Sequence, residues 1–306
     1  MQALVRSLVG AVCSTFGRGV AGRVTLAALV TAVGLLAQLP SADAATPAPD
    51  RCLALASLSP GLVPPYRQAR QSLIQRAKFE PTQLTDKLTP AEVRISFVGH
   101  STFLIESAQG VRIATDYNDY FRPNVVPEIV TMNRAHDSHY SNFPDPGIKH
   151  LLRGWGPDGA PAQHDVTLAD VRVRNIPTNT RDFAGGTTVY GNSMFVFEIA
   201  GLCIAHLGHL HHTLTLQQLS QLGQMDVVLV PVDGSFTMDL DGMVEVLKAI
   251  KAPLMIPMHY FSSYTLERFL TRVRDSFEIE HPTVASTVIS RSTLPQSQKV
   301  LVLPGR

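Results

Sequence analysis

Cysteine and tryptophan are scarce in this chain, with three cysteines and one tryptophan among 306 residues. So few cysteines exclude a small disulfide scaffold, and their wide spacing excludes a zinc-finger framework. Cys52 and Cys203 are the two that follow the N-terminal segment. They either pair in an oxidising compartment or remain buried free thiols, and the sequence leaves both states open.

The chain also lacks an excess of charge of either sign, with 26 Lys and Arg against 25 Asp and Glu. Without a basic field, binding to nucleic acid or to an anionic membrane surface is not expected. The content of 45% hydrophobic and 17% charged residues is typical of a globular protein. The oligomeric state is left open by these numbers.

Long apolar runs are missing apart from the stretch VTLAALVTAVGLLA at residues 24–37. Three arginines precede it, and the small residues Ala42 and Ala44 follow it. This order is typical of a secretory signal peptide, and the run falls short of the ~20 residues that a transmembrane helix needs. We predict a signal peptide over 1–44 and a periplasmic or secreted protein without membrane attachment after cleavage. Residues 45–90 are predicted to be an N-terminal extension and 91–306 the folded domain.

From residue 93 the hydrophobic pattern predicts strands first and then strands alternating with helices. The predicted strands are VRISFVG, STFLIES and VRIATD in an antiparallel meander, the hairpin SMFVFEIAGLCIAHLG, and the buried runs VVLVPV and PLMIPMHY. The segments LTLQQLSQLG and LDGMVEVLKAIKA have helical spacing. This mixture predicts an α/β fold with two sheets inside and helices outside, a four-layer αββα sandwich.

Histidines follow several of the predicted strands. They are His100 after ISFVG, His136 and His139 after IVTMN, His206 and His209 at LCIAHLG, and His259 after LMIPM. Strand ends at one edge of a sheet converge, and imidazole is the commonest protein ligand of zinc-like metals. These histidines predict a metal site at that edge of the sheet. His100 and His206 are expected to form outer hydrogen bonds, and His211 and His212 to lie on the solvated surface.

The same segments resemble the metallo-β-lactamase superfamily, and within it the hydrolases similar to ascorbate-6-phosphate lactonase. The resemblance covers about residues 93–263. It rests on the segments FVGHSTFLIE and VRIATD, the loop after IVTMN, the segment LCIAHLGHLHH, and the pair VPVDGSFTMD and IPMHY. The resemblance implies the αββα fold and hydrolysis by water that a metal ion activates.

The family loop His-x-His-x-Asp-His corresponds to RAHDSH, residues 134–139. By this resemblance His136 and His139 keep two ligand positions. Arg134 stands in place of the first histidine, and Ser138 in place of the aspartate that binds a second metal and orients the nucleophilic water. A guanidinium stays protonated and has no lone pair for a cation, so a standard two-metal site is not expected.

Further along the chain, the resemblance places His209 at the position of the bridging aspartate and His259 at that of the last histidine. Thr180 or Arg181 stands nearest to the position of another family histidine. The resemblance thus implies a metal site of His136, His139, His209 and His259. Three or four neutral imidazoles suit one Zn²⁺ ion, with Mn²⁺ as the alternative.

Three further side chains are predicted to take part in catalysis: Asp116, Arg134 and Ser138. Asp116 would fix the tautomer of a ligand imidazole, or else cap a turn. Arg134, with Arg181, would bind an anionic group of a small-molecule substrate, or else form salt bridges with Asp116, Asp137 or Asp182. Ser138 occupies the position of the missing loop aspartate.

These residues together predict an exported metal-dependent hydrolase with one ion, acting on an ester, lactone or phosphoester through water activated by the metal. The missing loop aspartate motivates an alternative. In that alternative the chain is a catalytically silent member of the fold that acts as a periplasmic binding protein.

Overall fold

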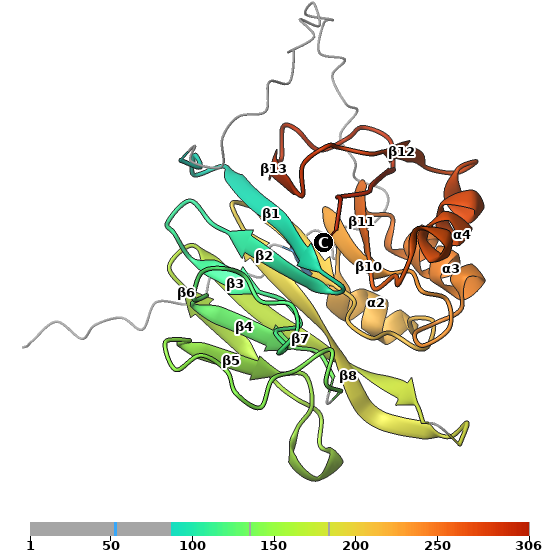
Figure 1. Ribbon diagram of the computed structural model, residues 1–306, viewed down its shortest axis with the longest axis horizontal. Helices are drawn as coiled ribbons and strands as arrows, with labels where there is room; N and C mark the ends of the chain where they lie inside the picture. The colour runs from blue at the N-terminus through green and yellow to red at the C-terminus, as the bar shows by residue number, and fades with distance from the viewer. Residues whose placement is uncertain (1–51, 54–86, 135, 183, 306) are drawn as a thin grey trace, which may run out of the picture. The chain divides into compact units, whose positions relative to one another are not determined.

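The computed structural model describes residues 52–53, 87–134, 136–182 and 184–305, which form two β-sheets and their flanking helices (Figure 1). The predicted signal peptide, 1–44, and most of the predicted extension, 45–90, lie outside the described residues. Within the part that is described, no helix is long and apolar enough to cross a bilayer.

The first sheet has six strands and contains the predicted N-terminal meander. Its spatial order is β13 (Ser286–Ser290), β1 (Glu92–Gly99), β2 (Thr102–Glu106), β3 (Arg112–Ala114), β4 (Ile129–Met132) and β5 (His150–Arg153). β1, β2 and β3 pair antiparallel, whereas β3, β4 and β5 pair parallel. β3 and β4 therefore deliver the residues after Ala114 and Met132 to the same edge of the sheet.

The second sheet has eight strands. Its order is β12 (Glu278–Glu280), β14 (Lys299–Leu301), β11 (Leu254–Met258), β10 (Val227–Pro231), β9 (Leu202–His206), β8 (Thr187–Ile199), β7 (Val171–Arg181) and β6 (Asp165–Leu168). β9, β10 and β11 are parallel neighbours, so the segments after His206, Pro231 and Met258 leave the sheet at one edge.

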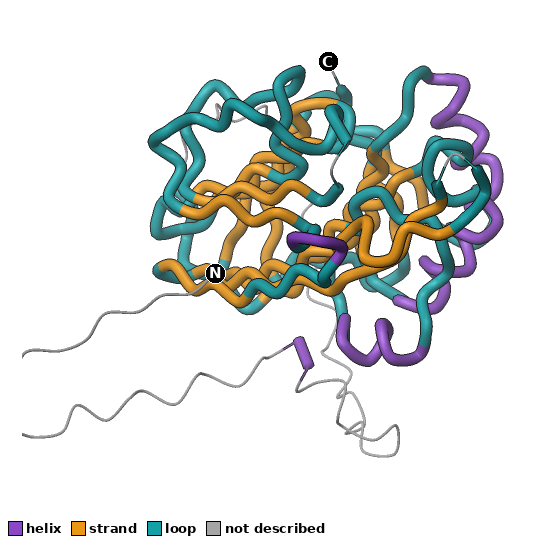
Figure 2. Tube along the Cα trace, turned by 90° about the horizontal axis from the view of Figure 1, so that it is seen from below, coloured by secondary structure: helices purple, strands orange, loops and turns teal. Residues whose placement is uncertain are grey.

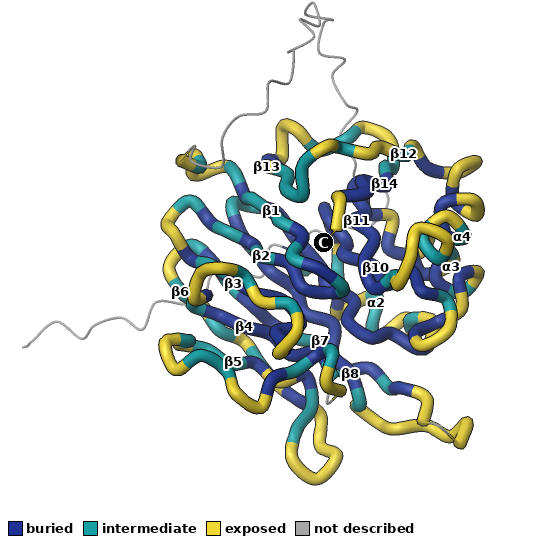
Figure 3. Tube along the Cα trace, in the orientation of Figure 1, coloured by how far each residue is buried: buried dark blue, intermediate teal, exposed yellow. Residues whose placement is uncertain are grey.

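The main core lies between the two sheets, where alternate side chains of each strand interlock. Ile95, Phe103 and Ile113 of the first sheet share one buried cluster with Phe197 and Leu229 of the second. Burying each such side chain contributes roughly 1.5–3 kcal/mol. Figure 3 shows the buried residues along the facing strands and the exposed ones mainly in the connecting loops.

A second core lies between the eight-stranded sheet and the helices α2 (Leu216–Leu222), α3 (Leu240–Ile250) and α4 (Ser263–Val273). In β10, Val228 and Val230 face this cluster while Val227 and Leu229 face the core between the sheets. Both faces of the strand are thus buried, which explains its unbroken apolar run. In Figure 2 these helices lie at one side of the strands.

The outer face of the six-stranded sheet is covered differently. Ala114, Val130 and Met132 pack there against side chains such as Tyr140 and Trp155 from the connecting loops. Among the described residues, no α-helix takes part in this cluster. The predicted α/β fold with two facing sheets and flanking helices is confirmed, with loops in place of helices over this face.

A disulfide joins Cys52 to Cys203, which are separated by 151 residues in the sequence. Cys203 lies in β9, and both cysteines are buried. Of the two states that the sequence left open, the structure has the paired one. The bond ties the segment before the domain to the strand that leads to His206 and His209.

Candidate metal centre

The candidate site forms where strands of both sheets end, and three of its residues have left-handed backbone conformations. His100 follows β1 with φ 52, Asp116 follows β3 with φ 44, and His259 follows β11 with φ 54. The backbone N–H of His259 donates to the carbonyl of His100 at 2.7 Å, which ties the two sheets together at this point. Strained backbone of this kind persists where surrounding structure enforces it, and it gathers at functional sites.

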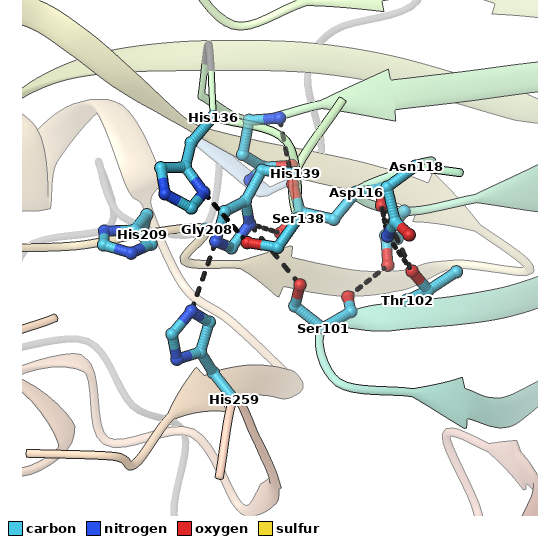
Figure 4. Close-up of polar contacts among 12 residues, drawn as sticks. Ser101, Thr102, Asp116, Asn118, His136, Ser138, His139, Gly208, His209 and His259 are labelled. Atoms are coloured by element: carbon cyan, nitrogen blue, oxygen red, sulfur yellow. Dashed lines mark hydrogen bonds and ion pairs between the residues drawn. The ribbon is translucent and has the colours of Figure 1, made fainter. Parts of the chain in front are cut away.

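Two buried imidazoles face each other at the centre of the site, with 3.2 Å between Nε2 of His139 and Nε2 of His259 (Figure 4). Nδ1 of His139 lies 2.7 Å from a carboxylate oxygen of Asp116, and Nδ1 of His259 lies 3.1 Å from one of Asp233. A neutral imidazole beside a carboxylate carries its hydrogen on the nitrogen that faces it. Both Nε2 atoms therefore direct lone pairs at each other.

This arrangement fits a metal ion. Two nitrogens that bind one zinc ion at ~2.0–2.1 Å with tetrahedral angles lie about 3.3 Å apart, close to the observed separation. Burial and the neighbouring histidines, His259 first among them, lower the pKa of His139 well below its usual value. A shared proton is thus disfavoured, and a cation is the partner that satisfies both lone pairs.

His100 is the third imidazole of this group, because its ligand nitrogen and those of His139 and His259 all lie within 4.8 Å of one another. Nε2 of His100 is buried and has no hydrogen-bond partner among the residues that the structure describes. Burial, followed by the charge of His259, lowers the pKa of His100 to about 4, which keeps the ring neutral near pH 7. Sequence reasoning gave His100 an outer role, because its approach to His259 depends on contact between the two sheets.

His209 lies beside this pair, with ring centroids 4.7 Å from His139 and 4.9 Å from His259. The ring of His136 is half exposed at the rim, with its centroid 6.0 Å from that of His139 and 6.2 Å from that of His209. The structure thus gathers all four predicted ligands, with His136 farthest out. The hydroxyl of Ser138 lies 3.1 Å from Nδ1 of His136. A carboxylate oxygen of Asp137 lies at the same distance from this nitrogen.

His211 lies behind His209 and is buried rather than on the surface where the sequence placed it. Its Nε2 lies 2.6 Å from Nδ1 of His209 and 3.2 Å from Nη1 of Arg134, and its Nδ1 accepts from the backbone N–H of Arg181 at 2.9 Å. Burial, Arg134 and Arg181 lower the pKa of His211 to about 3. Because Nδ1 of neutral His211 accepts, its Nε2 carries the hydrogen and donates to Nδ1 of His209. Nε2 of His209 then carries a hydrogen and donates, so in this arrangement the predicted ligand His209 has no lone pair for an ion.

His206 has both ring nitrogens in use. Nδ1 lies 3.0 Å from the side-chain amide nitrogen of Asn133 and accepts from the backbone N–H of Gly208 at 3.1 Å. Nε2 then carries the hydrogen and donates to the carbonyl of Ser101 at 2.9 Å. No nitrogen lone pair is left for an ion, so His206 holds the ends of β1 and β9 together.

Asp116 is fully buried and binds the backbone as well as His139, because it accepts from the N–H of Asn133 at 2.9 Å. Burial raises the pKa of its carboxyl group. Of the two roles that the sequence allowed, turn capping or fixing an imidazole, the geometry shows contact with the imidazole.

Asp233 was not singled out by sequence reasoning. Its carboxylate accepts from the backbone N–H groups of Ser235 at 2.9 Å, Phe236 at 2.6 Å and Thr237 at 3.2 Å, besides contacting His259. Burial opposes ionisation, but the hydrogen bonds from His259, Thr237 and the backbone lower the pKa of Asp233. The available signal was its position directly after the buried run VVLVPV, the same position that marked the histidines.

The Asp116→Asn variant should weaken metal binding about 10- to 100-fold, the usual effect of losing a carboxylate behind a ligand imidazole. Asn can still accept from Nδ1 of His139 but no longer supplies the charge that favours a bound cation. Competition with a chelator of known zinc affinity measures the change. Asp170→Asn is the matched control, since Asp170 accepts from Ser107 and Gln109. Equal zinc affinity in a folded Asp116→Asn variant would contradict the assignment.

The metal-free protein should lose stability as the pH falls from about 6.5 toward 4. Five site histidines have lowered pKa values, namely His100, His139, His206, His209 and His211. In this window the unfolded chain binds more protons than the folded one, so the free energy of unfolding rises with pH. Asp116, with its raised pKa, acts in the opposite direction but is a single group.

Urea unfolding of the metal-free protein at several pH values measures this dependence. Saturating zinc should shift the loss of stability to lower pH, because the ion binds neutral imidazoles. A free energy of unfolding that stays constant from pH 7 to pH 4.5 would contradict the burial of neutral histidines.

Comparison with known proteins agrees with this geometry. Residues 94–259 match the model of the beta-lactamase superfamily domain. A UPF0173 metal-dependent hydrolase from Thermoplasma volcanium is 26% identical over 197 residues, which cover 55% of this chain and 84% of that protein. A UPF0173 metal-dependent hydrolase from Methanoculleus marisnigri is 24% identical over 204 residues, 61% of this chain and 89% of that protein.

Among solved structures, a candidate zinc-dependent hydrolase of the metallo-β-lactamase superfamily from Thermotoga maritima is similar, with 28% identity and a TM-score of 0.52. The match covers 70% of this chain and all of that one. The matched family domain spans more than half of the chain and contains the strand ends that deliver His100, His139 and His259. The chain belongs to the metallo-β-lactamase superfamily.

Proposed function

We propose that the protein is an exported metal-dependent hydrolase that holds one ion between His139 and His259. The facing Nε2 atoms of these two residues, 3.2 Å apart and each backed by a carboxylate, are the observation that carries the proposal. His100 and His136 are the imidazoles that would supply further ligands, and Nε2–H of His209 would donate a hydrogen bond into the site. Zn²⁺ suits such a set of neutral nitrogens, with Mn²⁺ as the alternative.

When bound, such an ion lowers the pKa of water to about 7 and polarises a carbonyl or phosphoryl oxygen. Asp116 and Asp233 keep hydrogens on the Nδ1 atoms of their histidines, so that the opposite nitrogens stay free to bind. Ser138, in contact with His136 at the rim, is a polar group that can position a substrate. Hydrolysis of an ester, lactone or phosphoester follows from this chemistry.

Arg134 is the group proposed to bind an anionic part of the substrate. Burial lowers the pKa of its guanidinium, and among the described residues no carboxylate pairs with it. A partly buried cation without an acidic partner is costly, so an anion at this position stabilises the site. Arg181 is held differently, because its guanidinium donates to the backbone carbonyl groups of Thr237 at 2.5 Å and Ser235 at 3.4 Å.

The names of the related proteins support hydrolysis with a metal ion. They do not specify a substrate, and the branch similar to ascorbate-6-phosphate lactonase stays a prediction. The disulfide between Cys52 and Cys203 supports export, since such bonds persist mainly in oxidising compartments. Localisation in the periplasm or outside the cell is proposed on this ground together with residues 1–44.

A second candidate function is a binding protein without catalysis. It is favoured by Ser138 and His209, which stand where the resemblance places carboxylates. Neither side chain can act as the anionic base that the loop aspartate provides. Such a protein would bind the ion and an anionic ligand but would not turn the ligand over.

The protein should bind about one Zn²⁺ per chain and hydrolyse at least one member of a panel of acidic esters, lactones and phosphodiesters. A chelator should abolish the activity, and zinc should restore it. Metal content by mass spectrometry and product release measure the two properties. His259→Ala should lose both, whereas the control His281→Ala, at an exposed position, should keep both.

A metal content far below one ion per chain, after loading with Zn²⁺ or Mn²⁺, would overturn the metal assignment. Tight binding of one ion with no hydrolysis of any panel member would instead establish the silent binding protein.

The Arg134→Gln variant should raise KM for an anionic substrate about 10- to 100-fold, the effect expected for losing a hydrogen bond between charged groups. A neutral ester of the same acyl group should keep its KM, which makes it the internal control. Arg134→Lys should retain part of the affinity because it keeps the charge. An equal change in KM for the neutral and the anionic substrate would contradict the role of Arg134.

A further inference from the structure

Two exposed phenylalanines lie beside the imidazoles of the candidate metal centre. Phe236 and Phe261 are 66% and 59% exposed, and their ring centroids lie 5.5 Å apart in an edge-to-face arrangement. The ring of Phe261 lies 5.5 Å from that of His259 and 5.6 Å from that of His100. We call these two phenylalanines the aromatic pair. Exposed rings that adjoin one another next to a polar site mark a binding surface.

The backbone holds the aromatic pair in place. The N–H of Phe236 donates to Asp233 at 2.6 Å, and this carboxylate also contacts His259. Phe261 lies two residues after His259 and directly before Ser262, whose side chain caps α4 by accepting from the N–H of Thr265. Both rings are therefore anchored to the same elements as the metal ligand, which suits them to bind substrate without ordering a loop.

A series of contacts leads from the aromatic pair through the imidazoles to Arg134. Its guanidinium reaches His211, the ring centroid of His211 lies 4.8 Å from that of His209, and the ring of His209 lies beside that of His259. The imidazoles thus separate a cationic group from an apolar one. A molecule that binds both Arg134 and the aromatic pair carries an anionic group at one end and an apolar group at the other. Its reactive bond would then lie beside the imidazoles.

Resting on the proposed function, we infer that the substrates are amphiphilic anions. Each would carry a carboxylate or phosphate for Arg134 and an aryl or similarly bulky apolar group for Phe236 and Phe261. Aromatic rings of a ligand and of a protein attract each other in edge-to-face and offset arrangements, beyond the gain from burying their surface. Small polar esters and phosphates without such a group would be poor substrates.

Binding of phenylphosphonate and methylphosphonate to the zinc-loaded protein tests this inference by calorimetry. Both probes have the same anionic head and differ in the apolar group. Phenylphosphonate should bind about tenfold more tightly, which corresponds to ~1.4 kcal/mol. The double variant Phe236→Ala and Phe261→Ala should bind the two probes within about a factor of two. Since both rings are exposed, its thermal unfolding should match that of the wild type.

Tyr264→Ala is the matched control. Tyr264 is 74% exposed on α4, and within the described residues its ring contacts none of the site imidazoles. This variant should keep the tenfold preference. Equal affinity of the wild type for both probes would overturn the inference, as would a preference that persists in the double variant or disappears in the control.

The probes are not cleaved, so the outcome does not depend on catalysis. A preference for phenylphosphonate that the double variant loses supports the aromatic pair even in a protein that hydrolyses nothing. Hydrolysis of aryl and methyl esters with equal kcat/KM would overturn the inference while leaving the proposed function intact.

Discussion

The candidate site depends on two buried contacts between an imidazole and a carboxylate, His139 with Asp116 and His259 with Asp233. Each contact fixes a hydrogen on Nδ1 and turns a lone pair of Nε2 toward the opposite ring. Two such lone pairs 3.2 Å apart in a buried setting repel each other unless a cation lies between them. The four residues come from different strand ends of both sheets, so the packing of the sheets creates the site.

Asp233 links the candidate metal centre to the proposed substrate-binding surface. One carboxylate orients His259 and also accepts the backbone N–H groups of Ser235, Phe236 and Thr237. Arg181 binds the same turn from outside through the carbonyl group of Thr237. The position of Phe236 and the tautomer of His259 therefore depend on one side chain, and a change at Asp233 would disturb both.

The sequence predicted the strands and singled out the two central histidines for a physical reason that did not extend to the whole site. A run such as VVLVPV is apolar throughout because both faces of β10 are buried, and strand ends mark where His139 and His259 emerge. The place of His100 and His211 depends instead on contacts between distant segments. Pairing of Cys52 with Cys203 across 151 residues likewise requires tertiary geometry that no local pattern encodes.

The charges at the site support the proposal of one ion and an anionic ligand over a site with two ions. The two buried carboxylates, Asp116 and Asp233, balance the charge of a single divalent cation, and the buried imidazoles of His139 and His209 have lowered pKa values and are neutral. Arg134 then adds a positive charge that no described carboxylate offsets. A second divalent ion would increase this excess in a largely buried setting, where uncompensated charge is costly. Under the proposed function an anionic substrate group would reduce it, and Arg134, at a position where the resemblance places a ligand histidine, would favour one metal and an anionic substrate.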